Sequence, residues 1–400
     1  MMALVWSQCL LMQAQTLPEV TLLRQDTAEV VLPWPVNVQA RLDSLMTDPL
    51  LERTQLGLMV YDLSADSALY RYGSRQTLRP ASTMKLLTAV TALDLLGSQY
   101  DLRTYLYYTG KVSNRTLNGD IWIVGGMDPL FDETDMQVFV QTLRRLDVDT
   151  IRGCIVTDLS FKEDLKHGEG WCWDDDNYTL TPLLMSRKDE FVDRFVDELT
   201  ASGAVVNAPR TSGWLPKEAL LICSRSHRLM EVLEPMMKES DNLYAESVFY
   251  QIAATVGKRP ATAAHARQQI KSLIAKTGFS GAPYRIADGS GLSLYNYVTP
   301  ELMVRLLRYA YLKRDVMAAL YPALPVAGVD GTLKKRMKGG AAQGIVHAKT
   351  GTLSGVSSLA GYCRAANQHL LAFCIINQGV MKNAEGRGFQ DKVCEALCRP

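Results

Sequence analysis

The chain has 400 residues, 47% of them hydrophobic, so it can bury a sizeable core and form two domains or one domain with an insertion. Its 43 basic and 42 acidic residues give a formal net charge of +1, which argues against a nucleic-acid-binding surface. The five histidines include no H-x-x-x-H pair, which argues against a zinc enzyme, and we expect neither a metal nor a cofactor.

The N-terminal segment is mostly apolar up to about residue 14, and the first charged residue is Glu19. The segment is too short to span a bilayer. It resembles the apolar core and small-residue end of a secretory signal, although the basic start of such signals is missing. We therefore expect residues 1–15 to be a partial signal segment and the protein to be exported, without a stable membrane span. The eight cysteines do not decide the compartment, and their pairing stays open.

Apolar periodicity and turn residues predict the order of helices and strands. The first elements are a helix at 36–46, a hairpin of strands 55–62 and 68–72, and a buried helix over about 82–97. They are followed by strands at 103–108 and 119–124 and helices at 135–146 and 191–202. Helices then occur at 228–238, 242–254, 261–276 and 299–312. The last elements are strands at 347–352, 357–364 and 369–377 and a helix at 388–397.

Strands near both ends of the chain, with helices between them, predict an α+β fold in which an antiparallel sheet is flanked by helices. The pattern becomes strand-rich after Leu102 and helical again after Ser226. We therefore predict a β-rich inserted domain at 103–226, within a main domain formed by 16–102 and 227–400.

Ser82 and Lys85 form the one S-x-x-K pattern of the sequence. Pro80 and Ser82 indicate a helix start, because proline suits a first turn and serine can cap it. The run 86–96 is apolar almost all round, which predicts a buried helix ended by Gly97. Lys85 would lie one turn after Ser82, and burial would lower its pKa so that a neutral amine could take the serine proton. The plain alternative is a helix cap followed by a surface lysine.

Two further motifs follow, S-D-N at 240–242 and K-T-G at 349–351. S-x-x-K, S-D-N and K-T-G in this order are the motif set of penicillin-interacting serine enzymes. A second K-T-G at 276–278 ends a predicted helix, where a lysine in the last turn and a glycine cap explain it. We assign the functional copy to Lys349, which lies in a predicted strand.

The three motifs predict an acyl-transfer site. Ser82 would attack an acyl carbonyl, with Lys85 as the base, kept neutral by burial and by the like charge of Lys349. Ser240 would pass a proton to the leaving group. Asn242 would hold Lys85 and the substrate amide.

The segment 349–352 is predicted to bind the substrate. Lys349 and Thr350 offer a cation and a hydroxyl to a carboxylate, and Gly351 and Thr352 complete the segment. The backbone N–H groups of Ser82 and Thr352 would form an oxyanion hole. A carboxylate-binding group beside an acyl-transfer nucleophile implies a C-terminal peptide or a β-lactam as the substrate.

The chain resembles the class C low-molecular-mass penicillin-binding proteins, the D-alanyl-D-alanine carboxypeptidase/endopeptidase family. The similar stretches are 80–85, 118–129, 170–173, 240–246, 288–293 and 347–352, and coverage runs from about residue 36 to the end. The resemblance implies a β-lactamase/transpeptidase-like catalytic domain with an insertion that is shorter than in larger members. It implies a periplasmic or otherwise exported serine carboxypeptidase, acting on peptidoglycan stem peptides and acylated by β-lactam antibiotics. It leaves D,D-endopeptidase activity open.

The resemblance also singles out Asp128. In family members an aspartate of the inserted domain helps to bind a diaminopimelate side chain, and Asp128 matches that place. The plain alternative is a turn residue before Pro129.

Three other functions can be weighed against the carboxypeptidase. A β-lactamase needs a carboxylate that activates water, and Glu246, which follows the second motif, is expected to lie on a helix and support the structure. A penicillin-recognising sensor or scaffold without turnover would not need the full set of motif residues. An unrelated esterase would not need Lys349 as a carboxylate ligand. We therefore favour the carboxypeptidase.

Overall fold

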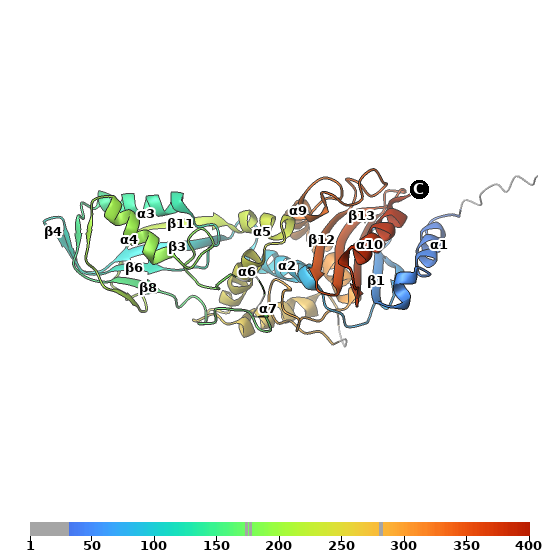
Figure 1. The fold of residues 1–400 in the computed structure, drawn as a ribbon, viewed down its shortest axis with the longest axis horizontal. Coiled ribbons are helices and arrows are strands. Elements are labelled where there is room, and N and C mark those ends of the chain that lie inside the picture. The colour runs from blue at the N-terminus through green and yellow to red at the C-terminus, as the bar shows by residue number, and fades with distance from the viewer. Residues whose placement is uncertain (1–31, 173–174, 176–177, 280–282) are drawn as a thin grey trace, which may run out of the picture.

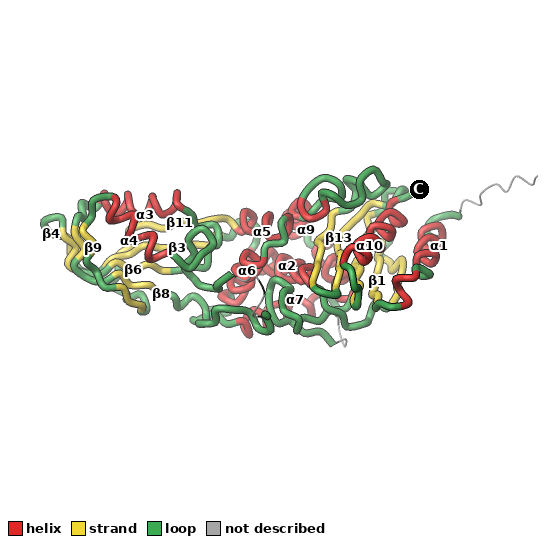
Figure 2. Tube along the Cα trace, in the orientation of Figure 1, coloured by secondary structure: helices red, strands yellow, loops and turns green. Residues whose placement is uncertain are grey.

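The computed structural model describes residues 32–172, 175, 178–279 and 283–400. The molecule is elongated, with strands toward both ends and a group of helices between them (Figure 1, Figure 2). The predicted signal segment, 1–15, lies outside the described residues. Within the described ranges, no helix combines the length and the apolar character needed to cross a membrane.

The first sheet has five strands in the order β12-β13-β14-β1-β2, and every neighbouring pair is antiparallel. It joins the predicted N-terminal hairpin to the three predicted C-terminal strands. The strands are β1 (Gln55–Asp62), β2 (Ser67–Tyr72), β12 (His347–Leu353), β13 (Val356–Arg364) and β14 (Leu370–Gln378). The central strands β13 and β14 are buried at almost every position because helices cover both faces.

One face of this sheet packs against the two terminal helices, α1 (Val36–Leu45) and α10 (Asn383–Cys398). The other face packs against a helical layer built around α2 (Lys85–Leu96), which is buried on all sides along most of its length, as predicted. The other helices of this layer are α5 (Leu229–Lys238), α6 (Asn242–Ala254), α7 (Ala263–Lys276), α8 (Pro300–Leu312) and α9 (Arg314–Ala323). The predicted α+β fold is confirmed.

The far end of the molecule holds two more sheets, with strand orders β10-β8-β6-β3-β11 and β4-β5-β7-β9. Two helices, α3 (Glu133–Arg145) and α4 (Phe191–Ala201), share a separate apolar core with them. The strands are β3 (Asp101–Tyr108), β4 (Lys111–Ser113), β5 (Thr116–Asn118), β6 (Ile121–Val124), β7 (Thr150–Ile151), β8 (Ile155–Asp158), β9 (Val205–Val206), β10 (Arg210–Ser212) and β11 (Leu220–Arg228).

The chain enters and leaves this far region at neighbouring points. β3 begins at Asp101 and β11 ends at Arg228, and these two residues pair directly in the antiparallel ladder. The division into an inserted domain at 103–226 and a catalytic domain at 16–102 and 227–400 stays a prediction.

One local prediction is wrong. Ser82 does not cap a helix: it lies inside a 3₁₀ turn, η2 (Ala81–Met84), which runs directly into α2. Gly291 packs so closely on this turn that an added Cβ would lie 2.0 Å from the Ala81 carbonyl oxygen, and Ala81 has a positive φ of +47°. The preferences of proline and serine for helix starts could not reveal this contact, because it joins residues far apart in the sequence. Helix α9 and the strands β4, β5 and β7 to β11 were not predicted.

Candidate active site

The three predicted motifs meet where η2, the start of α6 and the edge strand β12 come together. Lys85 Nζ is fully buried and lies 3.0 Å from Ser82 Oγ. It also donates to Asn242 Oδ1 at 2.7 Å and to the Ser290 carbonyl at 2.8 Å. The three hydrogens of an ammonium group therefore all have acceptors, and the amine is held in one position beside the serine hydroxyl.

Burial lowers the pKa of Lys85 to about 8, against the opposing charges of Asp288, Glu246 and Asp241. A lysine with such a pKa is neutral in an appreciable fraction of molecules near neutral pH, as a base must be. The sequence analysis expected the charge of Lys349 to lower the pKa of Lys85. In the structure this effect appears on Lys349, because the charge of Lys85 lowers the pKa of Lys349.

Lys349 is a second fully buried lysine. Its Nζ donates to Ser240 Oγ and to the Thr350 carbonyl, both at 2.8 Å. Burial and the charge of Lys85 hold the pKa of Lys349 well below its ordinary value. No carboxylate of the described chain forms an ion pair with Lys349. A buried cation without an anionic partner is unfavourable, so this position favours binding of an anion from outside.

The backbone is strained at two places in the site, at Ser240 and at Ala81, which precedes Ser82. Ser240 has a positive φ of +64°, as Ala81 does next to Ser82. The next residue, Asp241, caps α6 by accepting a hydrogen bond from the Tyr244 N–H at 3.1 Å. The loop is thereby fixed with the Ser240 hydroxyl directed at Lys349.

Gly351 allows β12 to approach the nucleophile. A Cβ at this position would lie 2.8 Å from the Pro80 carbonyl oxygen and 2.9 Å from the Ser82 nitrogen, so no side chain fits. The backbone of β12 therefore runs beside the Ser82 N–H, the first predicted oxyanion donor. Thr350 Oγ1 donates to Thr332 Oγ1 at 2.8 Å, and Thr352, the second predicted donor, has an exposed side chain.

The sequence analysis did not find two residues that support this site. Arg187, from the loop before α4, forms an ion pair with Asp241 of the second motif and donates to the Tyr178 hydroxyl at 2.6 Å. Nothing in the spacing of Arg187 signals this contact. Asp288 accepts hydrogen bonds from Gly291 N–H and Ser293 N–H. The stretch 288–293 was noted only for its resemblance to the family, without a role, and it supplies the Ser290 carbonyl that binds Lys85.

Glu246 supports the site from behind. It is 1% exposed and accepts hydrogen bonds from the N–H groups of Gly289 and Ser290, at 3.1 Å and 2.8 Å. Burial and the charge of Asp288 raise the pKa of Glu246 to about 8. Its carboxyl therefore fixes the loop that carries the Ser290 carbonyl.

The remaining predicted residue, Asp128, lies apart from this group. Its side chain is fully buried, 2.8 Å from His227 Nδ1, and it accepts a hydrogen bond from the Leu130 N–H at 3.0 Å. This geometry agrees with the turn interpretation, and the substrate-binding role of Asp128 stays a prediction. Lys276 of the second K-T-G ends α7 and pairs with Asp94 at 2.8 Å, as expected of a helix end.

Among the described residues, no group of three or more His, Cys, Asp or Glu side chains could hold a metal ion. The arrangement instead offers a serine hydroxyl and two buried lysines whose pKa values are lowered.

A family model described as the D-Ala-D-Ala carboxypeptidase 3 (S13) family matches residues 38–188 and 184–399. The chain belongs to this family. It is a serine-type D-Ala-D-Ala carboxypeptidase, as the sequence predicted.

Known S13 proteins resemble it over most of their length. The D-alanyl-D-alanine carboxypeptidase of Actinomadura sp. (strain R39) is 28% identical over 84% of this chain and 80% of its own length. DacB of Haemophilus influenzae is 26% identical over 86% of this chain and 88% of its own. The crystal structure of penicillin binding protein 4 from H. influenzae has a TM-score of 0.80 at 24% identity, covering 90% of this chain and 98% of that one. This last likeness confirms the fold.

We predict that acylation of this S13 enzyme depends on pH through Lys85. Lys85 must be neutral to accept the Ser82 proton, so the rate should rise about tenfold per pH unit well below pH 8 and level off above it. The measurement is the rate of acylation by a fluorescent penicillin from pH 6 to 10, with circular dichroism at each pH as the control for folding. A rate that falls as pH rises through 8 would contradict the assignment of the base.

Proposed function

We propose that this S13 carboxypeptidase releases the terminal D-Ala from peptidoglycan stem peptides through an acyl-enzyme on Ser82. The observation that carries this proposal is Lys349, a fully buried lysine without a carboxylate partner in the described chain, whose pKa is depressed by burial and by the charge of Lys85. A peptide with a free C-terminal carboxylate supplies the missing anion and sets its last amide bond beside Ser82.

Acylation begins when the substrate carboxylate binds Lys349 and Thr350. Neutral Lys85 takes the Ser82 proton, and Oγ forms a bond to the carbonyl carbon of the penultimate D-Ala. The negative oxygen accepts hydrogen bonds from the N–H groups of Ser82 and Thr352. One such donor contributes about 2.7–4 kcal/mol to transition-state stabilisation in other enzymes.

The intermediate then loses the terminal residue. The C–N bond breaks as Ser240 gives its proton to the departing nitrogen, and Ser240 regains a proton from the Lys85 ammonium. In the second half a water molecule attacks the ester carbonyl while Lys85 removes its proton. The proton then returns to Ser82 Oγ, and the shortened stem leaves with a new carboxylate.

The same site accounts for acylation by β-lactams. A β-lactam carries a carboxylate and a strained amide, and attack by Ser82 opens the ring without releasing a separate leaving group. The opened β-lactam therefore stays in the pocket of the acyl-enzyme, and the water needed for hydrolysis of the ester enters slowly. Cleavage of D-Ala–diaminopimelate cross-links would use the same steps. Because such substrates lie outside the cytoplasm, we also propose that the protein is exported.

A β-lactamase is the second candidate, and the position of Glu246 argues against it. Rapid deacylation needs a carboxylate that activates water. The Glu246 oxygens instead accept hydrogen bonds from Gly289 and Ser290.

The direct test is D-Ala release from a pentapeptide stem, measured by chiral chromatography. We expect one D-Ala per peptide, and we expect the same peptide with a C-terminal amide to react far more slowly, because it lacks the anion that Lys349 binds. Consumption of penicillin without any D-Ala release would contradict the proposal and favour a β-lactamase.

Replacing Lys349 by methionine should remove the carboxylate preference while keeping the side-chain volume. We expect kcat/KM for the peptide acid to fall about 10²- to 10³-fold, on the scale of breaking a buried ion pair. Activity on a neutral ester should change much less. Lys276→Met is the matched control, since it removes the lysine of the other K-T-G. An unchanged kcat/KM for the acid in Lys349→Met would refute the role of Lys349.

A further inference from the structure

Trp214 is an exposed tryptophan held in a fixed position on the far region of the molecule. Its exposed fraction is 64%, which is unusual for so large an apolar side chain. The backbone on both sides of it is tied to β8: the Gly213 N–H donates to the Thr157 carbonyl at 3.0 Å, and the Leu215 N–H donates to Asp158 Oδ2 at 2.9 Å. The indole is therefore presented to solvent by an ordered segment.

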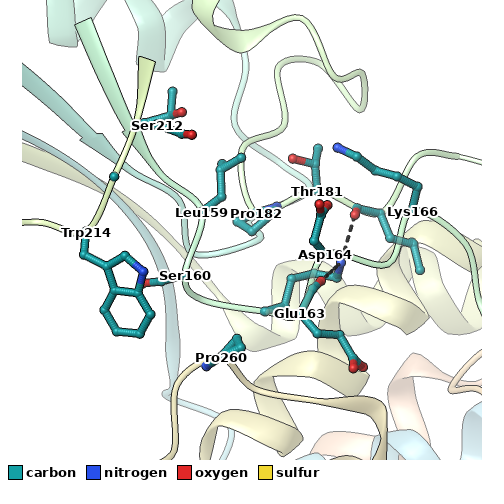
Figure 3. Close-up of a pocket in the computed structure, with 14 residues that line it drawn as sticks. Leu159, Ser160, Glu163, Asp164, Lys166, Thr181, Pro182, Ser212, Trp214 and Pro260 are labelled. Atoms are coloured by element: carbon teal, nitrogen blue, oxygen red, sulfur yellow. Dashed lines mark hydrogen bonds between the residues drawn. The ribbon is translucent and has the colours of Figure 1, made fainter. Parts of the chain in front are cut away.

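A cavity of about 470 Å³ lies beside this indole. Its size is within the range of small-molecule sites. Figure 3 shows Trp214 and Ser160 on one side and Asp164, Thr181 and Lys166 on the other. These side chains place hydroxyl, carboxylate and ammonium groups around the cavity, and Lys166 also pairs with Asp189 at 3.4 Å. Ser160, which also lines the cavity, has a buried Oγ without a hydrogen-bond partner in the described chain.

Aromatic side chains continue from this cavity onto the sheet. Trp122 of β6 pairs directly with Tyr107 of β3 and with Val156 of β8, so these side chains share one face. That face is opposite to the one on which α3 and α4 pack (Figure 1). A Cβ on Gly213 would lie 3.5 Å from the Trp122 ring. Trp214 thus extends an aromatic surface that reaches the cavity.

A flat aromatic plane beside scattered hydroxyl and charged groups suits a sugar. The C–H groups on one face of a pyranose are attracted to the negative face of the indole, while the sugar hydroxyls exchange hydrogen bonds with polar side chains. The mixed charges of Asp164 and Lys166 give no excess of positive charge, so a phosphorylated ligand is not favoured.

We propose that Trp214 and this cavity bind the glycan of the substrate, the N-acetylated amino-sugar strand to which stem peptides are attached. This inference rests on the proposed function, because it adds a second contact to the same polymer. Binding the strand raises the local concentration of stem peptides at Ser82. The reaction of polymeric substrates should therefore be favoured, and that of small peptides should be unaffected.

The test uses a soluble N-acetylglucosamine tetrasaccharide without peptide as the probe, titrated by calorimetry. We expect the wild-type protein to bind it and Trp214→Ala to bind about tenfold more weakly. Trp214→Tyr should restore part of the affinity. The control is Met381→Ala, which removes another exposed apolar side chain, 89% exposed, just before α10. The KM for glycan-linked peptidoglycan should rise in Trp214→Ala, with kcat unchanged.

Several results would overturn this proposal. They are no binding of the tetrasaccharide to the wild-type protein, equal binding by Trp214→Ala, or an equal loss in Met381→Ala. Measuring D-Ala release from a soluble peptide separates failure of the glycan site from failure of the proposed function. If the wild type releases D-Ala but does not bind the sugar, the glycan site fails alone. If it binds the sugar without releasing D-Ala, the proposed function fails alone.

Discussion

Ser82→Ala is expected to lower kcat/KM for D-Ala release by about 10⁴-fold or more, because it removes the atom that forms the acyl bond. The change deletes one half-buried oxygen that accepts a hydrogen bond from Lys85 Nζ, and the amine keeps Asn242 and Ser290 as partners. The fold should therefore persist. Steady-state kinetics on a pentapeptide stem provide the measurement.

The matched control for Ser82→Ala is Thr83→Ser, the next hydroxyl residue of the same turn. The Thr83 hydroxyl donates to the Pro80 carbonyl at 2.6 Å, and serine keeps this bond. We expect nearly normal activity in Thr83→Ser. Substantial D-Ala release by Ser82→Ala would mean that another group is the nucleophile.

Lys85→Met should have the second largest effect. Removing a positioned general base typically costs about 10²- to 10⁴-fold in rate, and methionine keeps most of the buried volume of Lys85. Acylation by benzylpenicillin should slow by a similar factor, because both substrates need the Ser82 proton removed. The measurement is the pre-steady-state acylation rate of the variant.

Lys85→Arg separates the base from the charge. Arginine keeps a cation and donors near Asn242 and Ser290 but remains protonated at any working pH. We expect it to be as inactive as Lys85→Met and to lose the rise in rate below pH 8. A rate in Lys85→Arg close to that of the wild type would show that the positive charge, and not the amine base, is what Ser82 needs.

The sequence was sufficient to predict that the three motifs meet, because motif order and local context are both visible in it. Lys349 could be separated from Lys276 because one lies in an alternating strand and the other before a glycine at a helix end, and the structure has them so. The α+β fold could be predicted for a related reason, since its sheet joins strands with clear alternation.

Contacts between residues far apart in the sequence could not be predicted. The resemblance suggested a substrate-binding role for Asp128, but the sequence did not show its contact with His227, which lies 99 residues further along the chain. Arg187 reaches Asp241 across 54 residues. Gly291 fixes the turn at Ala81 by packing alone. Neither periodicity nor capping rules contain such information, because they describe neighbours along the chain.

The most direct test of the acyl-enzyme is intact-mass measurement and peptide mapping after incubation with benzylpenicillin. We expect one adduct with the full mass of benzylpenicillin, located on the peptide that contains Ser82 and absent from Ser82→Ala. An adduct on another residue, or penicillin left unspent without an adduct, would contradict Ser82 as the nucleophile. Penicillin consumed without an adduct would contradict the carboxypeptidase and indicate a β-lactamase.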